Sequence, residues 1–221
     1  MPVDLTGIIL LTLGCAALAT PLMLVPGAAV GWLLARARFP GRTLLDTLVA
    51  LPLVLPPVAT GVLLLRVLSP RSALGQALDA IGFRVVFTWK AVVIAMAVMG
   101  FPLVVRAARA GFEQVPRRYE DVAATLGASP ARVFRTITLP LAGRSLLAGA
   151  LLGFSRALGE FGATLMIAGN IPGETRTIAM GIYAFSEAGH DGDASLLIGT
   201  SIAVAFVVLW LSNRLDRGAV A

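Results

Sequence analysis

An arginine and a glutamate lie four residues apart inside an apolar stretch of this sequence. The stretch 146–168 is otherwise hydrophobic, and it contains Arg156 and Glu160. A spacing of four places both side chains on one face of a helix, where they can form an ion pair. Charges in so apolar a segment are costly, so we expect the pair to face protein or water rather than lipid. Two interpretations stay open: a polar element beside a transport path, or a structural pair that fixes helix register.

Chemistry of other kinds has little support in the residue types. The sequence contains no Gly-x-x-x-x-Gly-Lys-Ser/Thr phosphate loop, and its only lysine, Lys90, follows Phe-Thr-Trp. The single cysteine, Cys15, permits neither an intrachain disulfide nor a cysteine metal cluster. His190 has acidic neighbours, but this is a weak metal signal that an exposed loop explains. We therefore expect no catalytic residue, no metal site and no cofactor bound by this chain.

The composition indicates that a lipid bilayer surrounds most of the chain. Hydrophobic residues make up 57% of the 221 positions, charged residues 14%, and the mean hydropathy is +0.88. Soluble domains contain about 25% charged residues. A helix needs about 20 apolar residues to cross the hydrocarbon core. Five runs reach or approach that length, which predicts an all-α polytopic membrane protein with about five spans within residues 8–213: 10–35, 44–68, 85–105, 146–168 and 194–211.

Basic residues predict the orientation of these spans. Twelve of the 18 basic residues fall in 36–43, in 106–144 and after 211, whereas five fall in the alternate segments. Cytoplasmic loops hold the excess of arginine and lysine, so we expect the N-terminus outside and the C-terminus inside. The net charge of +6 then reflects topology, and no nucleic-acid partner is needed. The first residues carry an acid and no base, so we expect the first run to be retained as a span rather than cleaved.

Two patterns predict how the spans are shaped. Prolines 52, 56 and 57 are expected to break the run 44–68, and Gly100-Phe101-Pro102 to break the run 85–105. Broken helices either line a substrate path or are simple packing kinks. Small residues recur every four positions in the run 146–168 and just before it: Ser145, Gly149, Gly153 and Ala157. This spacing predicts a seam for close helix packing, although glycine is also tolerated in membrane helices without a packing role.

A polar segment between the third and fourth spans is punctuated like a pair of short helices. Pro116 suits a first helical turn, and Gly127 suits a left-handed stop after it. Ser129 and Pro130 can then begin a second helix, after which Leu139-Pro140 is expected to turn the chain back to the membrane. So long a segment exceeds what a minimal connector needs. We expect a helix-glycine-helix docking surface for a cytoplasmic partner, within the loop 106–140.

This segment resembles the coupling motif of ABC-importer permeases, written E-A-A, three residues, G, nine residues, I, any residue, L-P. Asp121-Val122-Ala123 occupies the position of the triplet, and the remaining motif positions follow at the family's spacing: Gly127, Ile137, Leu139 and Pro140. Aspartate keeps the charge of the usual glutamate, whereas Val122 is larger than the usual alanine. The stretches 51–61, 87–129 and 156–183 are similar to the molybdate permeases of this family. Sulfate and tungstate permeases share related patterns.

The resemblance implies the type I importer permease fold in a bacterial inner membrane. It implies a second permease copy, expected to be identical, cytoplasmic ATPase subunits that use ATP, and an outside binding protein that delivers the anion. The motif residues, Asp121 to Pro140, would then contact the ATPase. Pro56, Pro57, Gly149, Gly153, Arg156 and Glu160 would serve the translocation path or helix packing. A channel or ion-coupled carrier remains the alternative, but it leaves the docking segment without a role.

Overall fold

The computed structural model describes residues 4–217 and contains helices but no strand among those residues. This confirms the predicted all-α fold class. Short turns separate most of the helices, which follow one another in this order: α1 Leu5–Arg36, α2 Arg42–Val54, α3 Pro57–Leu68, α4 Ala73–Ala80, α5 Trp89–Gln114, α6 Arg117–Thr125, α7 Pro130–Val133, the π-helix η1 Phe134–Thr138, α8 Leu139–Leu158, α9 Gly162–Ala168, α10 Ile178–Glu187 and α11 Asp191–Arg217.

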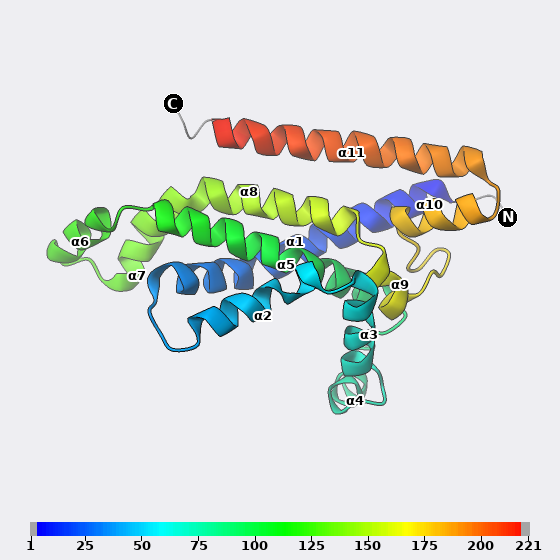
Figure 1. Cartoon of the computed structure of the whole chain (residues 1–221), viewed down its shortest axis with the longest axis horizontal. Coiled ribbons are helices and arrows are strands. Elements are labelled where there is room, and N and C mark those ends of the chain that lie inside the picture. Colours follow the sequence, from blue (N-terminus) through cyan, green and yellow to red (C-terminus); the bar gives the residue numbers. More distant parts are fainter. Residues whose placement is uncertain (1–3, 218–221) are drawn as a thin grey trace.

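The long helices lie side by side along the long axis of the molecule, as Figure 1 shows. Within the described residues, four are long and apolar enough to cross a membrane, and a fifth span is possible if the bent pair α2–α3 is counted as one. Helices α6 and α7 lie at one end of the axis, and the first turn of α1 lies at the other (Figure 1). The last turns of α11 lie toward the α6 end, opposite to the first turn of α1.

Helix α5 forms the centre of the bundle. In its most apolar 18-residue window 67% of the residues are buried, against 17% in α11, which is therefore peripheral. Helix α5 packs against α1 on one side and α8 on the other. Close approach to α1 depends on Gly27 and Gly31, because a Cβ atom there would lie 2.8 Å from a Val104 methyl and 2.7 Å from Ala108 Cβ. This glycine pair was not among the residues predicted from the sequence.

The predicted small-residue seam of α8 faces α5. A Cβ atom on Gly149 would lie 2.8 Å from Ala107 Cβ, and one on Gly153 would lie 2.7 Å from a Val104 methyl. Gly111 of α5 faces Ser145 in the same way, since a Cβ atom on Gly111 would lie 2.5 Å from Ser145 Cβ. Dispersion contacts between closely spaced backbones stabilise helix pairs in lipid, where burial of apolar surface contributes little. The glycines of the seam therefore lie at a packed interface.

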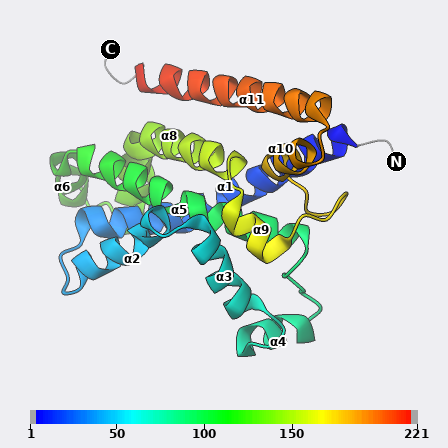
Figure 2. The ribbon, with the colours of Figure 1, turned by 45° about the vertical axis from the view of Figure 1, so that its right-hand side comes forward.

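The run 44–68 is divided into two helices that meet at an angle of 112°. The break falls at Leu55 and Pro56, and Pro57 is the first residue of α3. Pro52 lies inside α2, so the prediction that it also breaks the run is wrong. Because of the bend, α3 and α4 project sideways from the bundle beside α9, as Figure 2 shows.

The prediction that Gly100-Phe101-Pro102 breaks the third span is also wrong. Helix α5 continues through these residues from Trp89 to Gln114, so the polar loop begins later than the predicted boundary at 106. Gly100 instead permits packing, since a Cβ there would lie 2.7 Å from Met23 Sδ and 3.0 Å from the Gly153 carbonyl oxygen. Pro102 is buried, and neighbouring helices hold this part of α5 in place despite the lost backbone hydrogen bond.

The fourth apolar run begins earlier and ends earlier than predicted. Helical backbone is continuous from Pro130 to Leu158, so Leu139-Pro140 does not turn the chain. The π-helix η1 explains how the proline is accommodated. Its wide turn is closed by the Leu139 N–H, which donates to the Phe134 carbonyl, and it relieves the clash that a proline ring makes in a regular α-helix. The run 146–168 is instead interrupted at residues 159–161, between α8 and α9.

Candidate coupling site and broken-helix ion pair

The predicted glycine corner is present at the end of α6. Gly127 has a φ of +84°, a left-handed conformation that glycine adopts at little cost. Its N–H donates to the Ala124 carbonyl, and the Ala128 N–H donates to the Ala123 carbonyl, both at 3.0 Å. This pair of bonds is a Schellman motif, which satisfies the last carbonyls of the helix. The Ser129 hydroxyl then accepts from the Arg132 N–H, and Pro130 begins α7.

Glu120 holds this corner against the bundle. Its Oε1 lies 3.0 Å from Nη2 of Arg36, the last residue of α1. The Thr138 hydroxyl donates to the same carboxylate oxygen at 2.6 Å, and Arg36 Nη2 also donates to the Val115 carbonyl at 3.0 Å. Both charged side chains are mostly buried, and Thr138 is 2% exposed. One carboxylate thus connects α6, α1 and η1.

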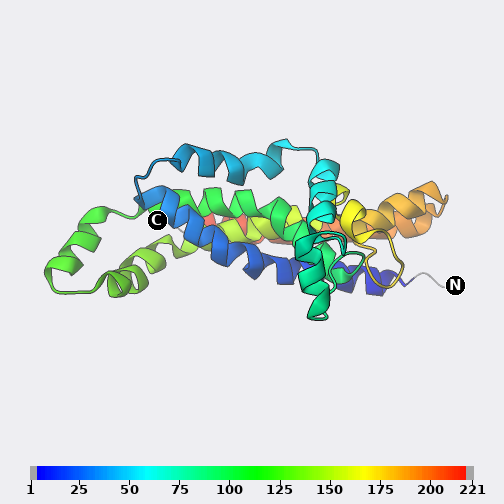
Figure 3. The same ribbon diagram turned by 90° about the horizontal axis from the view of Figure 1, so that it is seen from below.

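An aromatic cluster lies beside this network. The Trp32 ring of α1 meets the Phe134 ring of η1 edge-on, with centroids 5.8 Å apart. Phe134 also lies 6.3 Å from Phe112, which is fully buried near the end of α5. Such pairs contribute about 0.5–1.5 kcal/mol beyond their buried area. The segment 116–138 is therefore packed on the bundle rather than loosely tethered, although it extends beyond the long helices, as Figure 3 shows.

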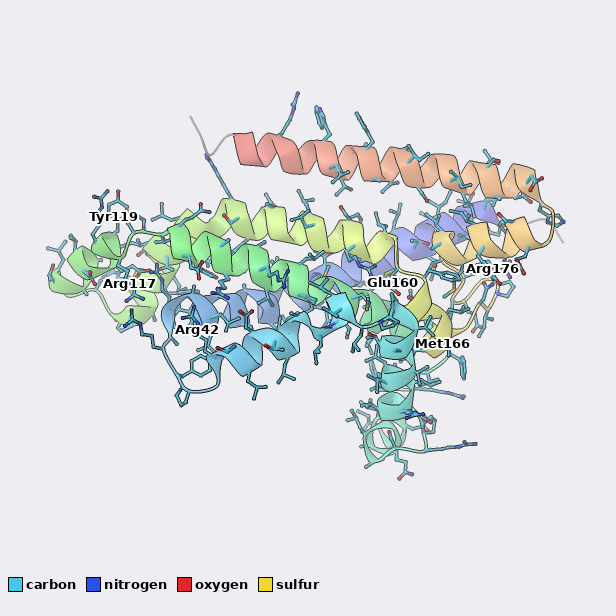
Figure 4. The ribbon with its side chains drawn as sticks, viewed as in Figure 1. Arg42, Arg117, Tyr119, Glu160, Met166 and Arg176 are labelled. Carbon is cyan, nitrogen blue, oxygen red and sulfur yellow. The ribbon has the colours of Figure 1, made fainter. Side chains whose placement is uncertain are left out.

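The opposite face of α6 is apolar and exposed. Tyr119, Val122 and Leu126 follow one another at spacings of three and four, which places them on one side of the helix. All three are exposed, and Leu126 reaches 83%. Arg117 and Tyr119 both lie on this protruding segment (Figure 4). Between α6, α7 and the end of α1 is a cleft of about 360 Å³, whose lining includes Asp121.

The motif residues therefore divide into inward and outward positions. Asp121, Leu139 and Pro140 are exposed, whereas Ala123 and Ile137 are half-buried. Gly127 forms the corner itself. The sequence did not predict the contacts among Glu120, Arg36 and Thr138. Glu120 was visible next to the motif, but its partners lie 84 and 18 residues away, and no local pattern links them.

The second charged site lies where α8 ends. Arg156 Nη1 is 2.9 Å from Glu160 Oε2, so the predicted ion pair is present. The prediction that both residues share one helical face deep inside a span is wrong, because α8 ends at Leu158 and Glu160 lies in the break. Glu160 is 1% exposed, and its Oε1 accepts from the Ala163 N–H of α9 at 2.7 Å. The arginine lies at the negative end of α8 and the carboxylate at the positive end of α9.

Helix α9 packs against α3, so the two interruptions of the fold lie together. A Cβ on Gly61 would lie 2.6 Å from the Ala163 carbonyl oxygen, and one on Gly162 would lie 3.0 Å from Pro57 Cβ. Figure 4 shows Glu160 and Met166 at this junction of α3, α8 and α9. Pro57 and the Arg156–Glu160 pair, predicted separately, are thus brought to one region by the tertiary structure. Pro56 caps the start of α3 there.

Comparison with known proteins assigns the chain to a family. Residues 27–220 match the family described as "Binding-protein-dependent transport system inner membrane component". The chain therefore belongs to this family of ABC-importer permeases, and it is a transport subunit of an inner-membrane system.

Two curated relatives and one solved structure illustrate the range of similarity. The molybdenum transport system permease protein ModB of Escherichia coli (strain K12) is 47% identical over 95% of this chain and 92% of the relative. The sulfate transport system permease protein CysT of Salmonella typhimurium (strain LT2) is 37% identical over 88% of this chain and 72% of the relative. A chain in the inward-facing MetNI methionine ABC transporter has a TM-score of 0.74 at 16% identity, covering 97% of this chain and 95% of that chain. It supports the predicted permease fold alone.

Proposed function

We propose that this chain is the permease subunit of an ATP-driven importer of molybdate. The observation that carries the proposal is the 47% identity with a molybdenum permease across 95% of the chain, against 37% across 88% for a sulfate permease. The predicted alternatives, sulfate and tungstate, remain outcomes of the test below.

The energy for transport enters through α6 in this proposal. The exposed apolar side chains of α6, together with the exposed Asp121 in the adjacent cleft, form the docking surface for a cytoplasmic ATPase subunit. An apolar stripe on a short helix is suited to insertion into a groove on a partner. ATP is bound and hydrolysed by that partner, since this sequence has no phosphate loop. The proposal places α6 in the cytoplasm and the first turn of α1 outside, consistent with the arginine distribution.

Two further partners complete the proposed importer. A second copy of this chain would cover α2, which has no buried residue in the single chain and exposes Leu48 and Val54. An outside binding protein would deliver the anion to the region of α4 and α10. The broken helices α2–α3 and α8–α9 would border the path, because backbone freed from regular helices is tolerated in a membrane where protein or a water cavity receives it. Selectivity would reside mainly in the binding protein.

Reconstitution in vesicles tests the proposal. We expect uptake of labelled molybdate only when the permease, its ATPase, the binding protein and ATP are all present. Excess unlabelled sulfate should compete weakly; preferential sulfate or tungstate uptake would reassign the anion. Strong molybdate accumulation without the ATPase would overturn the proposal in favour of a secondary carrier.

A matched pair of substitutions tests the docking surface. Leu126→Asp places a charge in the proposed contact and should release the ATPase from the purified complex. Leu74→Asp changes an exposed leucine of α4, far from α6 in Figure 1, and should leave ATPase co-purification unchanged. Equal retention of the ATPase by both variants would show that α6 is not the docking helix.

A further inference from the structure

Two helix ends with complementary charge meet beneath the proposed docking surface. Arg36 is in the last turn of α1, and Glu120 is in the first turn of α6. Each charge is favourable at its own helix end, since the C-terminal end of a helix is negative and the N-terminal end is positive. Thr138 ends the π-helix η1 and donates its hydroxyl hydrogen to the same carboxylate. π-helical turns frequently occur at functional sites, and here the turn includes the residue that binds Glu120.

We propose that Arg36, Glu120 and Thr138 are positioning residues that transmit displacement of α6 to the membrane helices, an inference that rests on the proposed function. Glu120 is distinct from the acid of the coupling motif. Asp121 is exposed beside the cleft and is available to a partner, whereas Glu120 is bonded inward to the bundle. Two adjacent acids thus have opposite tasks: Asp121 contributes to the docking face, and Glu120 connects that face to the bundle.

The connections of Arg36 explain why a movement of α6 would reach the core. Its Nη2 binds both the Glu120 carboxylate and the carbonyl of Val115, the residue that caps α5. Helices α1 and α5 are packed closely above this point through Gly27 and Gly31. Thr138 is followed without interruption by α8, whose seam packs on α5. Through Arg36, the Glu120 carboxylate is connected to α1 and to the end of α5. Through Thr138, it is connected to η1 and to α8, which follows it.

The network is sensitive to single changes because Thr138 is buried and the side chains of Arg36 and Glu120 are mostly buried. Hydrogen bonds between charged groups are shorter and stronger than neutral ones. Arg36 Nε is buried without a hydrogen-bond partner among the described residues, so the guanidinium depends on the two bonds of Nη2. Coupling energy can be altered by residues along a connected network that touch neither ligand. Loss of the Glu120 charge or the Thr138 hydroxyl should therefore weaken transmission while leaving the exposed docking face of α6 intact.

The experiment uses the full permease–ATPase complex in vesicles with the binding protein, and it compares Thr138→Val with Glu120→Gln. Labelled molybdate uptake and phosphate release are measured in the same sample. We expect both variants to retain the ATPase and to lower the molybdate transported per ATP about tenfold. Thr138→Ser keeps the hydroxyl and should rescue the ratio. Thr136→Val is the matched control, because Thr136 lies in the same π-helix but is exposed and bonds only to the Arg132 carbonyl.

Amide hydrogen exchange of residues 117–125 in the same complexes supplies a readout that does not depend on the transported anion. Exchange should be about tenfold faster in Thr138→Val and Glu120→Gln than in the wild type or Thr136→Val. A wild-type complex that takes up no molybdate would refute the proposed function, while the exchange data would still test the network. Wild-type exchange in both variants, or an unchanged transport ratio, would overturn the inference. Loss of the ATPase from both variants would overturn it too, since the three residues would then only support the docking face.

Discussion

Two ion pairs of the same chemistry lie in contrasting parts of this molecule. Arg36 and Glu120 are separated by 84 residues and join α1 and α6 at the end of the molecule where α6 lies. Arg156 and Glu160 are four residues apart and bridge the break between α8 and α9. Both pairs place the arginine at a helix C-terminus and the glutamate at a helix N-terminus, where the backbone dipoles favour them. The Arg36–Glu120 pair holds α6 against the end of α1. The Arg156–Glu160 pair allows the helical run to be interrupted between α8 and α9 among apolar neighbours.

Burial makes the consequences of losing a partner unequal. Glu160 is 1% exposed, whereas the Arg156 side chain is 28% exposed. An arginine can extend its long side chain toward water, but a buried carboxylate cannot. The Arg156–Glu160 pair should therefore tolerate loss of the acid better than loss of the base.

Arg156→Met should have the largest effect on stability, because it leaves the buried Glu160 charge with only the Ala163 N–H. We expect a loss of about 3–5 kcal/mol in the free energy of unfolding, measured in mixed micelles. Glu160→Gln should cost less, since the amide oxygen can still accept from Ala163 and Arg156 can reorient. The double variant should lose less than the sum of the two singles. Additive losses would show that the residues are not coupled.

Gly153→Leu should destabilise the α5–α8 contact by about 1–3 kcal/mol, because a Cβ there already lies 2.7 Å from a Val104 methyl. Gly143→Ala is the matched control in the same helix. Outside its own helical turn, no atom of the described residues lies within 4 Å of a Cβ at that position, so the change should be neutral or slightly stabilising. The same unfolding assay measures both variants. Equal stability of the two would exclude the seam as a tight interface.

Gly127→Val should disfavour the left-handed corner by about 1–2 kcal/mol and displace α7 relative to α6. The variant should still insert into the membrane and yet lose ATP-driven uptake. Gly127→Asn should retain much of the activity, since asparagine tolerates the left-handed conformation better than other residues with a Cβ. Uptake by vesicles containing each variant measures the difference. Normal transport by Gly127→Val would refute the role of the corner.

Arg42→Gln should have the smallest effect. Arg42 lies 4.0 Å from Glu113, and about a third or more of each side chain is exposed. Exposed ion pairs contribute about 0–1 kcal/mol, so we expect a change of less than about 0.5 kcal/mol in the unfolding assay. Figure 4 shows Arg42 at the start of α2, away from the Glu160 junction. A loss of stability as large as that of Arg156→Met would show that burial does not determine how much an ion pair contributes to stability.

Local patterns were sufficient for the features that a few neighbouring residues determine. Gly127, Ser129 and Pro130 predicted a corner between two short helices because each residue favours one backbone conformation. The spacing of four between Arg156 and Glu160 predicted their contact, although α8 ends between the two residues. Local patterns failed for prolines within helices: Pro102 and Pro140 were expected to interrupt or turn the chain, but neighbouring helices and a π-turn accommodate them.

Hydrophobicity and backbone preference act locally, so the sequence was sufficient to predict a membrane environment, the all-α class and the helix-glycine-helix segment. Which helices approach each other and which distant charges meet depends on how the helices pack. It placed α5 at the centre, brought α3 against α9, and bonded Glu120 rather than Asp121 to Arg36. Adjacent acids look equivalent in a sequence, but the orientation of α6 turns Glu120 toward Arg36 and leaves Asp121 exposed.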